Sequence, residues 1–331
     1  MEITTIWFAA IAFLWVGYLV LEGFDFGVGM WMPILGRNDT ERRVVLNTIG
    51  PVWDGNEVWL IVAGGATFAA FPEWYASMFS GFYLPLFVIL VALILRATAL
   101  EYRGKRDHPA WRRRWDWCIV GGSITPAFLW GVALANIVHG VPLDREHEYV
   151  GSVFDLLTPY ALLGGLAMVV LFLTHGAMFI ALKTTGDVRT RANRAAVRVG
   201  LLTLPIVGGF GAWTVADGDL ARTAPIALCA VAALLVGLVA ASAGRDGWAF
   251  AGTAVTIGLL TVLLFVALFP DVMRSSIDPA YSLTTSNAAA TAYTLEIMSW
   301  SAIVFVPLVM LYQAWSYWVF HKRIGTHHIP A

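Results

Sequence analysis

The chain has 331 residues, of which 59% are hydrophobic and 13% are charged, whereas about a quarter of the residues are charged in an average soluble domain. This composition excludes a soluble globular protein and indicates a membrane protein with several spanning helices. The formal net charge is −1 and the basic residues lie in short loops, so we exclude nucleic acid as a partner. Cys118 and Cys229 each lie in an apolar run, which supports neither a disulfide framework nor a metal site.

Nine apolar stretches are long enough to cross the bilayer, whose hydrocarbon core of about 30 Å needs roughly 20 apolar residues. The first has no basic leader and no cleavage site, so we expect a retained helix and not a signal peptide. The second is short, contains Gly64 and Gly65, and ends in a turn at Pro72. No repeat or long linker divides the chain, so we predict one transmembrane domain over residues 1–331. The predicted spans are residues 5–32, 53–71, 77–100, 117–138, 156–182, 199–216, 221–243, 248–269 and 292–320.

Lys and Arg are distributed unevenly among the connections between these spans. Seventeen of the 21 lie after spans one, three, five and seven or in the C-terminal tail, three lie in the other connections when Arg222 at the outer edge of the seventh span is counted with them, and Arg96 lies inside the third span. Cytoplasmic loops of membrane proteins carry the excess of positive charge. We therefore expect the N-terminus outside and the C-terminus in the cytoplasm, and the odd number of spans is consistent with termini on opposite sides.

An acidic stretch opens the second span. Residues 50–60 read Gly-Pro-Val-Trp-Asp-Gly-Asn-Glu-Val-Trp-Leu, with Asp54 and Glu57 one helical turn apart. Near the cytoplasmic end of the first span, Glu22 and Asp25 have the same spacing, which places them on one helix face. Ionisable groups close to a bilayer core are costly, so they indicate a functional site before a structural device.

Two further charged residues lie at a similar depth, Arg96 at the end of the third span and Asp116 at the start of the fourth. A row of acids leading inward from the cytoplasmic face, with an arginine to balance them, is what a proton-uptake path needs. Interfacial charges that reach water are the simpler interpretation, and it stays open for Asp116 and for the neighbouring Glu101. It is weaker for Asp25, Asp54 and Arg96, which lie within apolar sequence.

His175 is the histidine that lies well inside a predicted span. A haem iron needs an axial ligand such as His, Met or Cys, whereas a single membrane histidine more often hydrogen-bonds a neighbouring helix. We expect the second role for His175. This chain alone is therefore poorly equipped to bind several haems.

Several runs of the sequence resemble subunit II of cytochrome bd-type quinol oxidase. The Trp-Asp-Gly-Asn block within residues 53–60 is long and specific, and the likeness extends over essentially the whole chain. The sequence departs from the family pattern mainly in a short outer connection at residues 217–222 and in a short tail. The other matching runs are residues 23–29, 36–43, 79–83, 115–117, 140–142 and 311–315.

The resemblance implies a heterodimeric terminal oxidase in a bacterial or archaeal cell membrane, which oxidises membrane quinol and reduces O2 to water. It implies that haem b and haem d belong to the partner, subunit I, and that this chain supports that subunit. The implied fold is all-α, with nine transmembrane helices arranged as two four-helix bundles plus one peripheral helix. Lipid, a bound structural quinone and small single-helix accessory subunits are further ligands and partners that the resemblance admits, and the quinol can be ubiquinol or menaquinol.

Carried over by position, the resemblance implies that Asp54 takes up protons from the cytoplasm, with Trp53 shaping its surroundings. Asp25, Arg96 and Asp116 match positions where the family also has charged residues. We expect these three residues to support the proton path or the integrity of the haem pocket. We expect the same supporting role for Glu57, the acid that neighbours Asp54.

Two other functions fit these residues. A proton-coupled secondary transporter also places carboxylates and an arginine in the membrane, but here the charges cluster near one face and no pair of broken helices occupies corresponding halves. A scaffold subunit would use the acids only to pair with Arg96. Replacement of Asp54 by Asn separates these functions, because only the proton path predicts lower oxidase turnover with a normal haem content.

Overall fold

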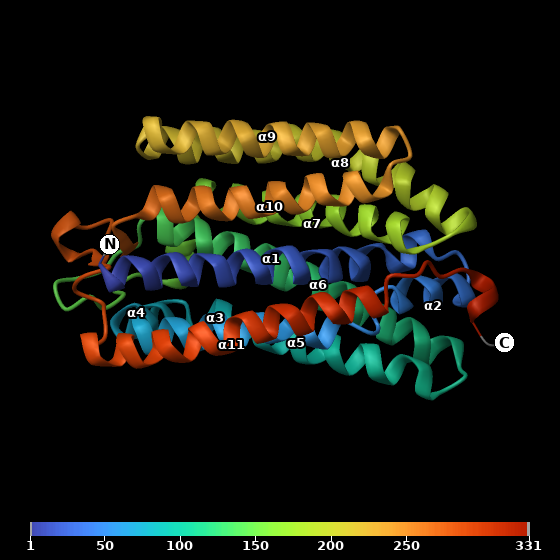
Figure 1. Cartoon of the computed structure of the whole chain (residues 1–331), viewed down its shortest axis with the longest axis horizontal. Helices are drawn as coiled ribbons and strands as arrows, with labels where there is room; N and C mark the ends of the chain where they lie inside the picture. Colours follow the sequence, from blue (N-terminus) through green and yellow to red (C-terminus); the bar gives the residue numbers. More distant parts are fainter. Residues whose placement is uncertain (1, 330–331) are drawn as a thin grey trace.

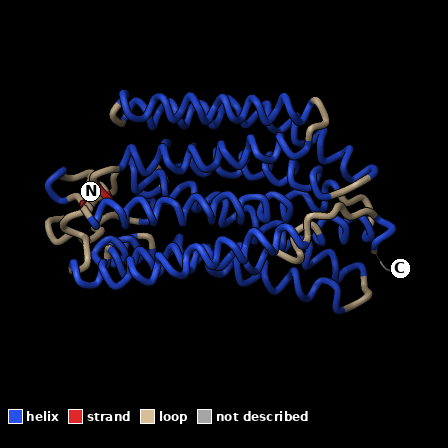
Figure 2. Tube along the Cα trace, in the orientation of Figure 1, coloured by secondary structure: helices blue, strands red, loops and turns tan. Residues whose placement is uncertain are grey.

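Helices make up most of the computed structural model, which describes residues 2–329. The long helices lie side by side along the longest axis of the molecule (Figure 1), and the loops gather at its two ends (Figure 2). The helices are α1 (Ile3–Leu35), α2 (Asp39–Asn47), α3 (Trp53–Ala70), α4 (Pro72–Gly81), α5 (Tyr83–Tyr102), α6 (Pro109–His139), α7 (Pro159–Lys183), α8 (Gly186–Asp217), α9 (Leu220–Ser242), α10 (Asp246–Leu268) and α11 (Ala292–Val319). The short elements are η1 (Arg103–Lys105), η2 (Val153–Leu156), β1 (Asp271–Met273), η3 (Pro279–Tyr281), β2 (Leu283–Thr284) and η4 (Thr326–His328).

Eight of the helices in the described part of the chain are long and apolar enough to cross a membrane, namely α1 and α5 to α11. Each of them overlaps one predicted span, which confirms the prediction of an all-helical protein with several membrane helices. The helix α3 coincides with the second predicted span but is less apolar, because its first turns contain Asp54, Asn56 and Glu57. Its 18 residues reach about 27 Å at 1.5 Å per residue.

The helix α1 lies at the centre of the molecule, where it packs against α3, α6, α7 and α10. Its contact with α7 is a direct backbone contact, because a Cβ atom added to Gly27 would lie 2.1 Å from the carbonyl oxygen of Phe172 and 2.7 Å from Cα of Gly176. The helix α11 lies at the periphery and packs mainly against α1 and α3. Within α11, which is described in full, Leu295 is the only buried residue.

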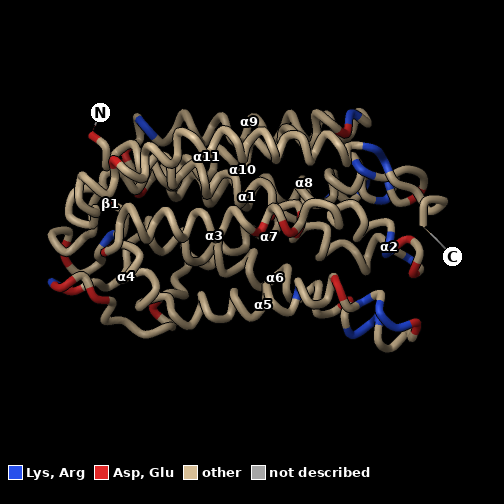
Figure 3. Tube along the Cα trace, turned by 60° about the horizontal axis from the view of Figure 1, so that its bottom comes forward, with Lys and Arg blue, Asp and Glu red and all other residues tan. Residues whose placement is uncertain are grey.

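Charge distinguishes the two ends of the molecule. Lys and Arg gather at the end that holds α2 and the C-terminus, which we call the basic end, while the opposite end with the N-terminus and β1 has few of them (Figure 3). At that opposite end β1 pairs with β2 in an antiparallel hairpin. Acidic residues also lie between the helices, near the middle of the molecule (Figure 3), and these belong to the site described next.

Candidate functional site

A buried arginine organises the polar residues between α1, α3 and α5. Arg96 on α5 has no exposed surface, and its Nη1 donates to Oε1 of Glu22 on α1 and, at 3.1 Å, to Oε1 of Glu57 on α3. The guanidinium also lies over the Phe26 ring, with 4.9 Å between Cζ and the ring centroid. Three helices that are distant in sequence therefore meet at one cation.

Close helix packing positions this arginine. A Cβ atom added to Gly122 on α6 would lie 2.6 Å from Cβ of Arg96, so the glycine lets α6 press against α5 at the level of the guanidinium. On α1, Glu22 and Asp25 are three residues apart and share a face, as their spacing predicts. Both carboxylates point into the protein, because neither has any exposed surface.

Asp25 is hydrogen-bonded to Asn56. Among the ion pairs of the described residues, those of Arg96 are with Glu22 and Glu57 and not with Asp25. The Nδ2 of Asn56 donates to Oδ2 of Asp25 at 2.7 Å. The Oδ1 of Asn56 accepts from Nε2 of Gln313 at 3.1 Å and from the hydroxyl of Tyr317 at 2.8 Å. Asn56 is fully buried, so it is the link by which the peripheral helix α11 reaches the carboxylates of the core.

The cluster contains more acid than base. The carboxylates of Glu22 and Glu57 contact the single guanidinium of Arg96, and Asp25 lies one helical turn from Glu22, so the positive charge balances these acids only when some of the carboxyl groups hold protons. Within residues 2–329 the buried atoms Oε2 of Glu22, Oδ1 of Asp25, and Nε and Nη2 of Arg96 have no hydrogen-bond partner. Buried polar groups without partners are uncommon and mark functional or hydrated sites. The arrangement can therefore take up and release protons.

Exposure decreases stepwise along this cluster. Asp54 in the first turn of α3 is exposed and Trp53 beside it is half-buried. Glu57, one turn further along α3, has 22% of its side-chain surface exposed, whereas Arg96 and Glu22 have none. The acidic pair predicted from the sequence thus leads from the protein surface to the buried arginine.

Asp116 lies in a second charged cluster at the basic end. Its two carboxylate oxygens accept from Arg42 at 2.8 Å and from Arg103 at 2.5 Å, and Arg103 also pairs with Asp39 at 2.9 Å. These interactions join α2, η1 and α6. The structure therefore brings together Asp25, Glu57 and Arg96 of the predicted site residues, with Asp54 at the edge, but it does not bring Asp116 to them.

A neighbouring ion pair at the basic end holds α2 against α8. Nη2 of Arg191 lies 2.7 Å from Oε2 of Glu41, which also accepts from the backbone N–H of Arg37 at 2.8 Å. Partial burial opposes ionisation of Glu41, but these hydrogen bonds and the arginine charge prevail and lower its pKa below the ordinary value. This pair is structural: Glu41 lies on α2, outside the membrane helices, and Arg191 lies in the first turns of α8, before the predicted span 199–216.

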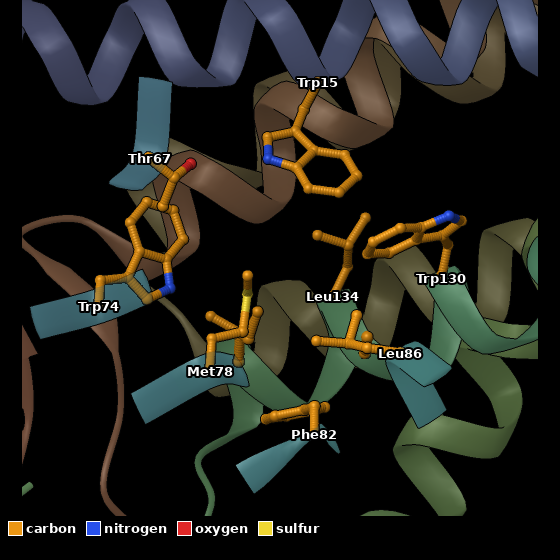
Figure 4. A pocket seen from close by; sticks show the side chains of 10 residues that line it. Trp15, Thr67, Trp74, Met78, Phe82, Leu86, Trp130 and Leu134 are labelled. Atoms are coloured by element: carbon orange, nitrogen blue, oxygen red, sulfur yellow. The ribbon is translucent and has the colours of Figure 1, made fainter. Parts of the chain in front are cut away.

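Trp15 of α1 lines a small cavity (Figure 4). Tyr18 and Glu22 follow it at three and seven residues, which places all three on one face of α1. The cavity volume is about 10 Å³, roughly the space of one water molecule. Trp130 packs edge-on against Trp15 and Tyr18, with ring centroids 4.9 and 6.2 Å apart. Within the described residues, the Tyr18 hydroxyl and the Trp130 indole N–H have no hydrogen-bond partner. Polar atoms thus extend the cluster along α1 away from the basic end.

His175 has a structural role and does not fit a haem iron. Its Nε2 lies 3.1 Å from the carbonyl oxygen of Val20, which can only accept, so Nε2 donates. Its Nδ1 then accepts from the hydroxyl of Thr253 at 2.7 Å. The ring is stacked on Phe250 at 4.5 Å between centroids. No nitrogen lone pair remains for iron, and the expected hydrogen bond to neighbouring helices is confirmed.

Sequence reasoning noted Glu22 only as a neighbour of Asp25, and it missed Asn56 and Tyr317. In the sequence, the position of Asn56 between Asp54 and Glu57 is one signal for it. A buried amide in an otherwise apolar helix is itself a signal, since it must find hydrogen-bond partners on adjacent helices.

Taken together, these features define an all-helical, multi-pass membrane protein with carboxylates gathered round one buried arginine. The sequence profile of a family described as "Cytochrome bd terminal oxidase subunit II" matches residues 3–320. The chain belongs to this family.

Individual relatives agree with the profile. Cytochrome bd ubiquinol oxidase subunit 2 of Bacillus subtilis (strain 168) is 42% identical over 325 residues, which cover 97% of this chain and 96% of the relative. Cytochrome bd-I ubiquinol oxidase subunit 2 of Escherichia coli (strain K12) is 37% identical over 358 residues, covering 96% of this chain and 94% of the relative. A chain in the structure of bd oxidase from Geobacillus thermodenitrificans has a TM-score of 0.71 at 15% identity, covering 97% of this chain and all of that chain, and it supports the fold alone.

Proposed function

We propose that this chain is the second subunit of a heterodimeric quinol oxidase that reduces O2 to water, and that it supports a haem-bearing subunit I. The observation that carries this proposal is the family match over residues 3–320. The two relatives described above are subunits of ubiquinol oxidases. In the proposed complex, the substrate is ubiquinol or menaquinol. The same match favours an oxidase over a secondary transporter.

Within that complex we assign to this chain a part in proton uptake from the cytoplasm. The supporting geometry is the decrease in exposure from Asp54 through Glu57 to Arg96 and Glu22. Asp54 accepts the proton from water, Glu57 passes it inward, and the excess of carboxylates round Arg96 stores it. Asp25 and Trp53 assist as neighbours, while Asp116 stabilises the basic end of the same path.

The chain crosses the membrane nine times in this proposal, in two four-helix bundles (α1, α3, α5 and α6; α7 to α10) with α11 outside them, all within one domain of residues 1–331. The basic end faces the cytoplasm, because most of the Lys and Arg residues lie there. The termini lie at opposite ends of the molecule (Figure 1), which fits an odd number of crossings. The membrane is that of a bacterial or archaeal cell.

Subunit I covers the apolar face of α11 and the side of α5 that carries Leu90 and Ile94 in this proposal, and it holds haem b and haem d. Side chains such as Leu90, Ile94 and Leu311 are more than half exposed on these helices, and lipid or small single-helix subunits cover what remains. His175 offers no ligand to iron, which agrees with haem bound on the partner.

A structural quinone fits the groove of about 550 Å³ between α1 and α10. The rings of Phe8, Phe13 and Phe265 line it, and Arg222 at one edge can donate to a quinone carbonyl. This arginine lies in the first turn of α9, directly after the short connection that follows α8, so the contact does not need a longer loop.

Replacement of Asp54 by Asn tests the proton-uptake assignment. The amide keeps the size of the side chain but cannot carry a proton, so we expect at least a tenfold decrease in quinol oxidase turnover. Reduced-minus-oxidised spectra of the purified complex measure haem b and haem d, which we expect at normal levels. Glu101→Gln is the matched control, since Glu101 is also exposed at this end, and it leaves turnover unchanged. Normal turnover of Asp54→Asn with normal haem content would overturn the assignment.

A further inference from the structure

A groove between α5 and α6 lies apart from the charged cluster. It has a volume of about 470 Å³, which is within the range of small-molecule sites. Its lining is almost wholly apolar and includes Phe87, Val91, Leu95, Trp117 and Gly121. The part of α5 from Phe87 to Leu95 rises about 12 Å, which is enough for much of an extended acyl chain.

Two adjacent glycines form this groove. A Cβ atom added to Gly122 would lie 2.7 Å from the carbonyl oxygen of Ala92, so α5 and α6 touch there and close the floor of the groove. A Cβ atom added to Gly121 would meet no atom within 4 Å. The missing side chain of Gly121 therefore leaves open a space that most other residues would fill.

Arginines without partners lie beside the groove, toward the basic end. Arg113 and Arg114 precede Trp117 by four and three residues, so they share its helix face one turn nearer that end. Both are exposed and neither makes an ion pair within residues 2–329, whereas the adjacent Arg112 pairs with Asp39 at 2.9 Å. Trp117 is 67% exposed, as is usual for a tryptophan at a membrane interface.

We propose that this groove binds one anionic phospholipid from the leaflet at the basic end. Its acyl chain lies along the groove, and its phosphate lies between Arg113 and Arg114, whose planar guanidinium groups suit phosphate oxygens. The two unpaired positive charges select a head group with net negative charge over a zwitterionic one, whose ammonium they repel. Asp116, the nearest acid along α6, does not compete because Arg42 and Arg103 already bind it.

Native mass spectrometry of the intact, detergent-washed oxidase complex tests this site. The complex is titrated with phosphatidylglycerol or phosphatidylcholine of the same acyl chains. We expect one phosphatidylglycerol to bind more tightly than phosphatidylcholine. In the double variant Arg113→Gln, Arg114→Gln this binding weakens at least tenfold, because each basic residue near a membrane surface contributes about fivefold to the attraction of an anionic lipid.

Two further variants separate the head-group contact from the groove and from general charge. Gly121→Leu fills the groove without altering charge and weakens binding, and we expect the fold to stay intact because a Cβ atom at this position meets no atom within 4 Å. The double variant Arg194→Gln, Arg198→Gln removes equal charge from exposed positions on α8 and leaves the tight binding unchanged. Equal binding of the two lipids, or unaltered binding by the Arg113 and Arg114 variant, would overturn the proposal. The photoreactive residue p-benzoylphenylalanine in place of Leu95 should cross-link to lipid, and a cross-link to the partner subunit would also overturn it.

Discussion

At the scale of single residues, Arg96 is the cation on which the buried acids depend. It has two carboxylate partners, and two of its nitrogens have no hydrogen bond within the described residues. Removing one partner of a buried ion pair leaves the other charge uncompensated, which costs about 3–5 kcal/mol. Replacing both partners by neutral groups avoids that cost. The pair Arg96 and Glu22 therefore allows a test of how strongly the charges depend on each other.

We expect Arg96→Met to lower the yield of assembled complex and its Tm, because Glu22 and Glu57 lose their cation. Adding Glu22→Gln to this variant should restore part of the lost stability, since the most deeply buried of the two carboxylates is then neutral. Differential scanning fluorimetry of the four purified complexes measures the coupling between the two positions. Equal Tm values for Arg96→Met and the double variant would contradict the dependence.

The sequence predicted part of this site for a simple reason. The spacing of Asp54 and Glu57, and of Glu22 and Asp25, places each pair on one helix face whatever the helix packs against. Asn56 could not be found in this way, because its partners Asp25 and Tyr317 come from α1 and α11. Which faces of separate helices meet depends on how the helices pack. The periodicity of a single helix carries no information about that packing.

At the scale of elements, the helices pack most closely where glycines replace larger side chains. Gly27 of α1 and Gly176 of α7 bring two backbones into contact, and a Cβ atom on Gly176 would lie 2.5 Å from Cα of Gly27. Hydropathy located both helices correctly, because burial in lipid requires only apolar length. It could not show that α11 would remain almost uncovered while α1 became the centre of the molecule.

Gly27→Ala should destabilise the protein, because its methyl group would overlap the carbonyl oxygen of Phe172 in a rigid backbone. Overpacking of this kind costs about 1–3 kcal/mol, and we expect a lower Tm of the purified complex. Gly209→Ala on α8 is the matched control, since a Cβ atom there meets no atom within 4 Å. If both variants melt at the temperature of the unaltered complex, the contact between α1 and α7 is not tight.

At the scale of the whole molecule, α3 decides how many times the chain crosses the membrane. Its charged first turns make it less apolar than the eight membrane helices, yet its 18 residues span about 27 Å, close to the roughly 30 Å of hydrocarbon. If α3 crosses the membrane, Glu73 at the start of α4 lies on the side opposite to Thr40 of α2 and to Asp107. If it does not, Glu73 lies on the same side as Thr40, while Asp107 stays opposite because α5 crosses in both arrangements.

Single cysteines at these three positions, in a chain whose Cys118 and Cys229 are replaced by Ala, distinguish the two arrangements. All three side chains are exposed, so each cysteine can react. We expect a membrane-impermeant maleimide to label Glu73→Cys in intact cells, and Thr40→Cys and Asp107→Cys only after the membrane is opened. The reason is that the basic end, with Thr40 and Asp107, faces the cytoplasm in the proposed orientation. Equal labelling of Glu73→Cys and Thr40→Cys in intact cells would remove α3 from the membrane, and with it the route from Asp54 to Arg96.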